Sequence, residues 1–246
     1  QCVAATLVRL SFNRCIRVTD RAIATLFQQN GSVVDGFPSL ETLELVRLPL
    51  TAVTLQILAS NDSYLRLPRL SSISLQGSVK INTAGLLDFI GQRRNTIIAT
   101  TTQQQSRVNE LDSIDLRGMP LLSPVFLSHL ALEAPYVHRL AIDMSLLHSP
   151  SVAAQSYDAN AVGHYAWALK QLQLFRQLEH LVVDADGTKD GLHREPARVW
   201  WSICNSLPHL STLTLIGRWL PTHHHVYESD ADWGWTVPLD TAKHST

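Results

Sequence analysis

The sequence has few of the features that mark membrane, secreted or nucleic-acid-binding proteins. No stretch reaches 18 consecutive apolar residues, and the first residues, QCVAATLVRL, have neither the charged start nor the cleavage site of a signal peptide. Twenty Lys and Arg stand against twenty-one Asp and Glu, so no overall positive field is available to neutralise a nucleic acid backbone. We therefore expect a soluble chain with no membrane partner and no nucleic acid partner.

Cysteine is also scarce. The three cysteines, Cys2, Cys15 and Cys204, are an odd number, and their spacing fits neither a zinc motif nor a disulfide framework. A reducing compartment, cytoplasmic or nuclear, fits this usage best. The chain begins with Gln and enters a structural pattern almost at once, so we also expect that an N-terminal part of the protein is missing.

A repeated apolar pattern dominates the 246 residues, of which 45% are apolar. The spacing apolar-x-x-apolar-x-apolar occurs seven times, at intervals of 33, 30, 41, 26, 41 and 32 residues. The seven hexamers begin at Leu7, Leu40, Leu70, Leu111, Val137, Leu178 and Leu210. In such a hexamer the fourth and sixth residues point to one face of a short strand, and one unit alone cannot bury that face. Stacked units can bury it together, as in repeat proteins.

The segments between the hexamers support this interpretation. Four of them, 19–29, 51–60, 82–90 and 123–134, place apolar residues at roughly helical spacing after a Thr, Asn or Ser that can cap a helix. The pattern predicts an α/β fold, a curved parallel sheet with outer helices built from about seven irregular repeats over residues 1–220. The remaining residues, 221–246, lack the repeat spacing and are expected to form a C-terminal cap or tail.

The first unit, LVRLSFNRCIRVTDRAIATL, resembles the cysteine-containing subtype of leucine-rich repeat. Its Leu-x-x-Leu-x-Leu-x-x-Cys pattern is followed by an apolar-Thr-Asp turn and a short helix, and LSSISLQGSVKINTAGLLDFI repeats it more weakly. The resemblance covers roughly residues 3 to 217 and implies a leucine-rich-repeat solenoid. At the ninth position, where the family has Asn or Cys, only Cys15 fits.

The cysteine-containing subtype is typical of F-box proteins, which present substrates to a cullin-type ubiquitin ligase. The resemblance thus implies a protein-interaction module, the substrate-recognition part of such a ligase, with a ligase adaptor bound through an F-box preceding residue 1. No F-box is visible in the sequence itself. The alternative is a repeat scaffold or regulator unconnected with ubiquitin.

Two intervals of 41 residues predict insertions near residues 91–109 and 146–176. The first contains RRNTIIATTTQQQSRVN, which is polar and low in complexity, and predicts an exposed mobile loop. The second contains SYDANAVGHYAWALKQLQLF, whose apolar residues have helical spacing and predict a long helix against the sheet.

The candidate binding site is the sheet face opposite the buried leucines. The third, fifth and seventh residues of each hexamer unit point to that face, which is concave in a curved solenoid, and a protein partner or substrate would bind there. The candidate residues are Arg9, Asn13, Glu44, Ser72, Ser74, Gln76, Asp115, Arg117, Arg139, Asp143, His180 and Asp184.

Other chemistry has little support in the sequence. There is no Gly-x-Ser-x-Gly elbow and no phosphate-binding glycine motif, and Cys15 and Cys204 fit buried packing positions better than nucleophilic ones. We predict no cofactor and no metal. A metal-dependent hydrolase using the segment His223 to Asp232 remains a weaker alternative, because adjacent histidines cannot all face one ion.

Overall fold

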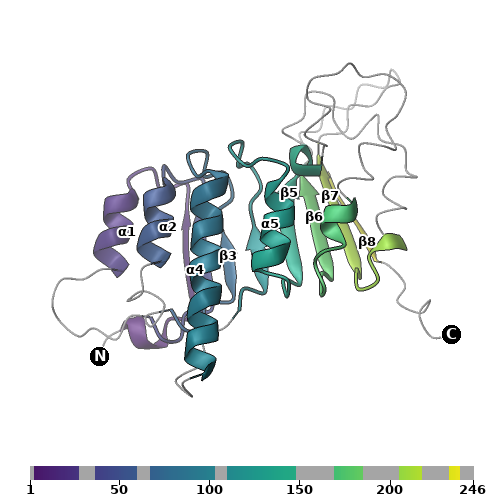
Figure 1. The fold of residues 1–246 in the computed structure, drawn as a ribbon. Helices are drawn as coiled ribbons and strands as arrows, with labels where there is room; N and C mark the ends of the chain where they lie inside the picture. Colours follow the sequence, from purple (N-terminus) through teal and green to yellow (C-terminus); the bar gives the residue numbers. More distant parts are fainter. Residues whose placement is uncertain are drawn as a thin grey trace, which may run out of the picture.

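The computed structural model describes residues 3–27, 37–59, 67–102, 110–147, 169–184, 205–217 and 233–238. It is an α/β structure in which seven strands, β1 to β7, form a parallel sheet in sequence order, and β8 pairs antiparallel with β7 at the end (Figure 1). The strands are β1 (Arg9–Asn13), β2 (Thr42–Val46), β3 (Ser72–Ser74), β4 (Ser113–Asp115), β5 (Arg139–Asp143), β6 (His180–Asp184), β7 (Thr212–Gly217) and β8 (Trp233–Pro238). Each parallel strand falls on one of the seven predicted hexamers.

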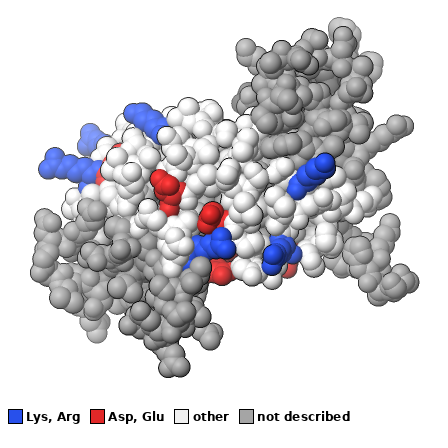
Figure 2. Space-filling view, in the orientation of Figure 1, with Lys and Arg blue, Asp and Glu red and all other residues white. Residues whose placement is uncertain are grey.

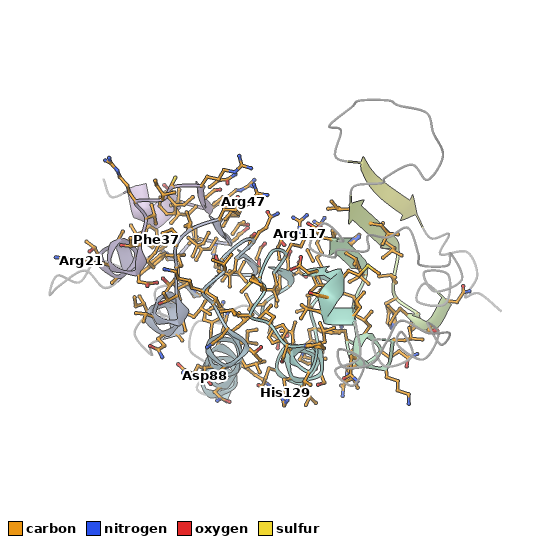
Figure 3. The ribbon with its side chains drawn as sticks, turned by 90° about the horizontal axis from the view of Figure 1, so that it is seen from above. Arg21, Phe37, Arg47, Asp88, Arg117 and His129 are labelled. Carbon is orange, nitrogen blue, oxygen red and sulfur yellow. The ribbon has the colours of Figure 1, made fainter. Side chains whose placement is uncertain are left out.

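Helices lie on one side of this sheet (Figure 1). They are α1 (Asp20–Phe27), α2 (Ala52–Ala59), α4 (Thr83–Thr102) and α5 (Phe126–Glu133), and the 3-10 helices are η1 (Val3–Thr6) and η2 (Met144–Leu147). Each of the four α-helices begins within one of the four predicted helical segments, α4 extends well beyond its segment, and each helix packs against the next along the row. Seen from above, this row follows an arc with the sheet on its inner side (Figure 3).

The core lies between the sheet and the helices. The fourth and sixth hexamer residues from the second unit onward are all buried, as Leu43 and Leu45 of β2 are at 0% exposure. Leu7, Leu10 and Phe12 of the first unit are only half-buried, because β1 is the edge strand. Each fully buried leucine contributes about 1.5–3 kcal/mol to stability, so the repeated spacing is the main source of folding energy.

A proline turn leads into four of the strands. The backbone N–H of Leu40 donates to the carbonyl oxygen of Phe37 (3.1 Å), and the same turn recurs at 67–70, 134–137 and 207–210. Its second residue is a proline in all four cases: Pro38, Pro68, Pro135 and Pro208. Proline fixes the backbone angle that this turn position needs, and each turn therefore aims the chain into the next strand.

A second backbone feature also recurs from unit to unit. The backbone carbonyl oxygen of the second residue of a hexamer accepts hydrogen bonds from two N–H groups of the next unit. Glu41, for example, accepts from Ser71 (3.0 Å) and Ser72 (2.9 Å). The same double acceptor occurs at Val8, Ser71, Asp112, His138 and Glu179. These bonds fix the register at which each strand joins its neighbour.

The chain leaves the first four strands through a left-handed residue. The eighth residue of each unit has a positive φ: Arg14 (54°), Arg47 (53°), Gly77 (71°) and Gly118 (69°). Glycine adopts this conformation without steric cost, whereas a residue with a Cβ is strained there. The turns at the ends of β1 to β4 therefore all need a left-handed backbone conformation, which the two glycines adopt without strain.

Asp20 links the first two helices at their N-terminal ends. Its carboxylate accepts hydrogen bonds from the backbone N–H of Thr51 (2.9 Å) and from the hydroxyls of Thr51 (2.8 Å) and Thr54 (2.5 Å). Burial alone would raise the pKa of Asp20, but these hydrogen bonds outweigh it and the pKa lies below its ordinary value. Asp20 of the predicted Thr-Asp turn thus ties the first unit to the second.

The prediction of an exposed loop from residue 93 is wrong for residues 93–102, which continue α4. Arg93 lies in the interior at 2% exposure. Its Nη2 donates to the carbonyl oxygen of Leu70 (2.6 Å), and Nη1 and Nη2 both lie 3.4 Å from the carbonyl oxygen of Leu67. The guanidinium therefore binds the proline turn before β3, from within the segment that was predicted to be a loop.

Several expectations fall outside the described residues. These are the loop over 103–109, most of the helix predicted at 156–175, of which 169–172 is helical, and the segment around Cys204. Within 221–246 the structure describes β8, which pairs with β7 through six residues. No helix among the described residues is long and apolar enough to cross a lipid bilayer.

Candidate functional site

The predicted outward-facing residues form three rows across the sheet, and the first two rows are in strand-to-strand register from β1 to β7. The first row is Arg9, Thr42, Ser72, Ser113, Arg139, His180 and Thr212, each paired with its neighbour in the next strand. The second row is Ser11, Glu44, Ser74, Asp115, Ala141, Val182 and Thr214, paired in the same way. The third row is Asn13, Val46, Gln76, Arg117, Asp143, Asp184 and Ile216, at or just beyond the strand ends.

Exposure separates these rows from the core residues between them. Leu140 and Leu181 are at 1% and 0%, whereas Arg139 is exposed and His180 is half-buried. Ala141 is the exception, buried at 8%. The alternation follows from the two-residue period of a strand with one face on a core. Figure 3 shows Arg117 on the sheet side, with Asp88 and His129 on the helix side.

The helix side differs in character from the rows. In the face shown in Figure 2 most of the described surface is uncharged, and basic side chains gather at the end that carries α1. Arg14, Arg17 and Arg21 are exposed in that region of the chain. The charged and polar side chains of the sheet side, in contrast, are spread along strands that hold them at fixed spacing.

Ion pairs and hydrogen bonds order the side chains of the rows. Nη2 of Arg9 lies 2.5 Å from Oε1 of Glu44, between neighbouring strands. Asp115 receives two hydrogen bonds from the Arg117 guanidinium, at 2.9 and 2.8 Å, and one from the Ser74 hydroxyl at 3.4 Å. Side chains that are already held by such contacts lose less conformational entropy on binding, because their geometry is already fixed.

Arg117 sits in a negative environment. The hydrogen bond to Asp115 raises the pKa of Arg117, desolvation opposes this, and the charges of Asp115, Asp184 and Asp143 raise it further. Asp143 and Asp184 follow Arg117 in the third row, at the ends of β5 and β6.

Asp143 closes the turn at the end of the preceding unit. Its two carboxylate oxygens accept the backbone N–H of Gly118 at 2.9 and 3.0 Å. Burial raises the pKa of Asp143, and the nearby charge of Asp184 raises it further, while hydrogen bonds from Gly118 and Met119 and the charge of Arg117 lower it less. The folded state therefore disfavours the ionised form of the Asp143 carboxyl.

His180 adds a further fixed contact in the first row. Its Nδ1 lies 2.5 Å from the hydroxyl oxygen of Thr212, and its Nε2 lies 4.0 Å from Oε2 of Glu179. The ring is therefore positioned by the next strand, with Arg139 directly paired on the other side.

Cys15 is exposed, so the prediction that it packs in the interior is wrong. Its thiol donates to the backbone carbonyl of Asn13 (3.4 Å) within its own turn. The turn that holds Cys15 follows β1, the edge strand of the sheet.

Sequence reasoning also missed a groove at the opposite end of the strands. A cavity of about 510 Å³ lies between α4, α5 and residues 173–176, and Arg93, Glu133, Tyr136 and Leu174 are among its lining residues. The pattern of proline turns was a signal for its position, since Pro135 of one such turn is among its lining residues.

A neighbouring open hollow contains Ser71, Asp112 and His138. Nδ1 of His138 lies 2.6 Å from Oδ1 of Asp112, but the geometry is not that of a hydrogen bond. The Ser71 hydroxyl is directed to the carbonyl oxygen of Glu41 (3.5 Å), so the serine is not activated by the histidine.

In the described ranges no group of three or more His, Cys, Asp or Glu side chains could hold a metal ion. The His223 to Asp232 segment lies outside those ranges. No model of a known protein family matches the chain, and a search of curated proteins also found no match.

Proposed function

We propose that this protein is a leucine-rich-repeat solenoid that binds another protein through the three rows on its sheet face. The observation that carries the proposal is the register of those rows, which places side chains from seven consecutive strands at regular spacing on the side away from the helices. A rigid surface that presents many small polar and charged groups is suited to recognising a folded partner or an extended peptide.

Three recurring backbone features support the solenoid. The proline turn, the double carbonyl acceptor and the left-handed eighth residue each recur at one position of the unit. Because each fixes one part of the unit, successive units stack with the same orientation. The cysteine-containing first unit supports the leucine-rich-repeat subtype.

The contacts within the rows favour binding over catalysis. Asp115 is held by Arg117, Glu44 by Arg9, and His180 by Thr212. Each of these groups has a partner that fixes it in place, and the hydroxyl beside His180, that of Thr212, comes from the neighbouring strand of the same sheet face. Polar groups that are held in place by their neighbours are suited to giving a binding surface its specificity.

The resemblance narrows the proposal to the substrate-recognition part of an F-box-type ubiquitin ligase, acting in the cytoplasm or nucleus. The alternative is a leucine-rich-repeat scaffold or regulator unconnected with ubiquitin. The two differ in their partners, since a ligase subunit must also bind an adaptor and a cullin.

Affinity capture with the longest natural version of the chain, followed by mass spectrometry, tests both levels. A sheet-face variant, Glu44→Lys with Arg139→Glu, is compared with a helix-side control, Asp88→Lys with Arg21→Glu. Both double variants exchange one acidic and one basic residue, so their net charge equals that of the natural protein. All four positions can accept a long polar side chain, because none is buried.

Partners that are lost in the sheet-face variant and retained in the control would support binding through the rows. Retention of every partner in both variants would refute it. Among the row-dependent complexes, a ligase adaptor and a cullin would support the ubiquitin role, and partners without them would support the scaffold.

A further inference from the structure

The first part of the chain is basic, although the whole chain is close to neutral. Residues 1–102 contain ten Lys and Arg against six Asp and Glu, whereas residues 103–246 contain ten against fifteen. Figure 2 shows basic side chains gathered at the end that carries α1. The net charge of -1 therefore hides a basic part that can attract an anionic partner.

Four exposed cations of this part lie on the turns that lead from strand to helix. These turns, residues 14–19, 47–51 and 75–82, are described without a gap. Their exposed charged and aliphatic residues form a surface that we call the turn patch: Arg14, Ile16, Arg17, Arg47, Val79 and Lys80. The patch continues from the third row, because Arg14 directly follows Asn13 of β1 and Arg47 directly follows Val46 of β2. Figure 3 shows Arg47 on the sheet side.

Backbone contacts hold the three turns side by side. The N–H of Arg14 donates to the carbonyl oxygen of Val46 (2.9 Å), and the N–H of Arg47 donates to that of Gln76 (2.7 Å). Lys80 forms a parallel bridge to the second turn. Since neighbouring strands lie about 4.8 Å apart, the backbone that carries the cations crosses three units within about 10 Å.

The four cations of the turn patch lack acidic partners. No ion pair joins any of them to an acid in the described part of the chain. The two acids nearest in sequence are bound elsewhere, Asp20 by the hydroxyls of Thr51 and Thr54, and Glu44 by Arg9. Like charges on neighbouring units repel each other, so a partner that brings carboxylates to the patch relieves this repulsion.

Two of the cations also occupy a backbone conformation that favours glycine. Arg14 and Arg47 have φ values of 54° and 53°, whereas glycine stands at the same position of the next two units, as Gly77 and Gly118. The stem of Arg47 lies across Gly77, where an added Cβ would be 2.7 Å from Cγ of Arg47. Strained residues are concentrated at functional sites. The strain at Arg14 and Arg47 therefore points to a role for their side chains.

Exposed aliphatic side chains lie among the cations. Ile16 is 79% exposed and Val79 is 53% exposed, and each is the tenth residue of its unit. Apolar groups beside charged ones are typical of protein-binding surfaces. An anionic membrane also suits cations beside aliphatic groups. The continuity of the patch with the third row favours a protein partner.

We propose that the turn patch binds an acidic segment of a partner protein, whose carboxylates face the four cations and whose aliphatic side chains rest on Ile16 and Val79. The inference goes beyond the proposed function, because the patch lies on the turns and its binding does not require the rows. A partner that lies on the rows can extend such a segment over the patch, since the third row leads into it.

Three labelled peptides test the proposal by fluorescence anisotropy with the full chain. The acidic probe is SDELEIDES, and its neutral counterpart is SNQLQINQS, in which amides replace the carboxylates. The acidic probe should bind about tenfold more tightly than the neutral one, and high salt should remove the difference. The third peptide, SDESESDES, keeps the charges without the aliphatic residues and should bind more weakly than the acidic probe.

Two double variants locate the binding. Arg14→Gly with Arg47→Gly should lower the affinity for SDELEIDES about fivefold, the effect of two exposed charge pairs. It should not lower the urea midpoint, because glycine fits the left-handed positions, so a loss of binding cannot come from unfolding. Lys170→Gln with Arg176→Gln is the matched control, because it removes the same charge from two exposed residues outside the patch and should leave the affinity unchanged.

Equal affinities for SDELEIDES and SNQLQINQS would overturn the proposal, and so would an equal loss in the patch variant and the control. Equal affinities for SDELEIDES and SDESESDES would overturn the role of Ile16 and Val79. Vesicles of phosphatidylcholine and phosphatidylserine test the alternative, since binding to vesicles that depends on Arg14 and Arg47, without binding of SDELEIDES, would make the patch a membrane site.

These outcomes are separable from failure of the proposed function. The sheet-face variant Glu44→Lys with Arg139→Glu changes no residue of the turn patch. Loss of partners in that variant without peptide binding leaves the rows as the interface and refutes the turn patch. Peptide binding that depends on Arg14 and Arg47, with every partner retained in the sheet-face variant, supports the turn patch and refutes the rows.

Discussion

Replacement of Arg93 gives the sharpest test of how the structure is held together. The side chain is 2% exposed and binds the carbonyl oxygens of Leu67 and Leu70, with one short bond at 2.6 Å and two longer ones at 3.4 Å. A hydrogen bond from a charged donor contributes about 1.5–3 kcal/mol, and the buried stem adds packing that alanine cannot replace. Relief of the buried charge offsets part of this loss.

We expect Arg93→Ala to lower the free energy of unfolding by about 3 kcal/mol. Arg93→Met, which restores the packing of the stem, should lower it by about 1–2 kcal/mol. The adjacent Arg94 is the matched control, since it is half-exposed and forms a 3.4 Å ion pair with Glu133 and a 2.7 Å hydrogen bond to the carbonyl of Leu132. Arg94→Ala should cost less than about 1 kcal/mol.

Urea unfolding followed by circular dichroism measures all three variants. For a chain of this size a loss of about 3 kcal/mol corresponds to a fall in Tm of about 6–12 °C. If Arg93→Ala and Arg94→Ala had the same midpoint, the guanidinium of Arg93 would not be holding the turn before β3, and the account of why α4 continues past residue 92 would be wrong.

Three further predictions concern the turns and the carboxylates. Gly118→Ala should destabilise the protein by about 1–2 kcal/mol in urea unfolding, because φ is +69° and the added Cβ would lie 3.2 Å from Cα of Gly77. Gly91→Ala within α4 should instead stabilise it by about 0.5–1 kcal/mol, and the opposite signs would contradict the backbone argument. The folded-state pKa of Asp20 is lowered, so its contribution to stability is present above the unfolded-state pKa of about 4 and is lost as the pH falls from there through the lower folded-state pKa. The stability difference between the natural protein and Asp20→Asn should therefore shrink in acid melts, and a constant difference would count against the argument. The folded-state pKa of Asp143 is raised, so its ionisation costs stability as the pH rises above about 4. Asn at this position still accepts the Gly118 N–H, so Asp143→Asn should gain stability relative to the natural protein between acid and neutral pH, and a relative loss would refute this.

The strand part of the fold could be predicted from the sequence because it is encoded by local spacing. The hexamer at Leu40, for example, gives the buried Leu43 and Leu45 and the outward Thr42 and Glu44 without knowledge of any distant residue. The same spacing gave the three rows, so the placement of the predicted binding residues on one face was also predictable. What they bind is not encoded in that spacing.

The parts that were missed depend on distant contacts. Residues 93–102 contain several β-branched residues with low helix propensity, and their helix is supported by the buried Arg93. The strand β8 exists through pairing with β7, although the alternation in WGWTVP was a usable signal. The proline two residues before Leu40, Leu70, Val137 and Leu210 was the most regular signal left unread, and it marks the turn into the strand.

The constant strand register has a consequence for how such a chain can change over time. Starts of successive hexamers are separated by as few as 26 and as many as 41 residues, yet β3, β4 and β5 pair without any shift. Differences in length are absorbed on the helix side, as the eight residues of α2 beside the twenty of α4 illustrate. Insertions and deletions there leave the three rows in place, so the chain can acquire new outer segments and new row side chains independently of each other.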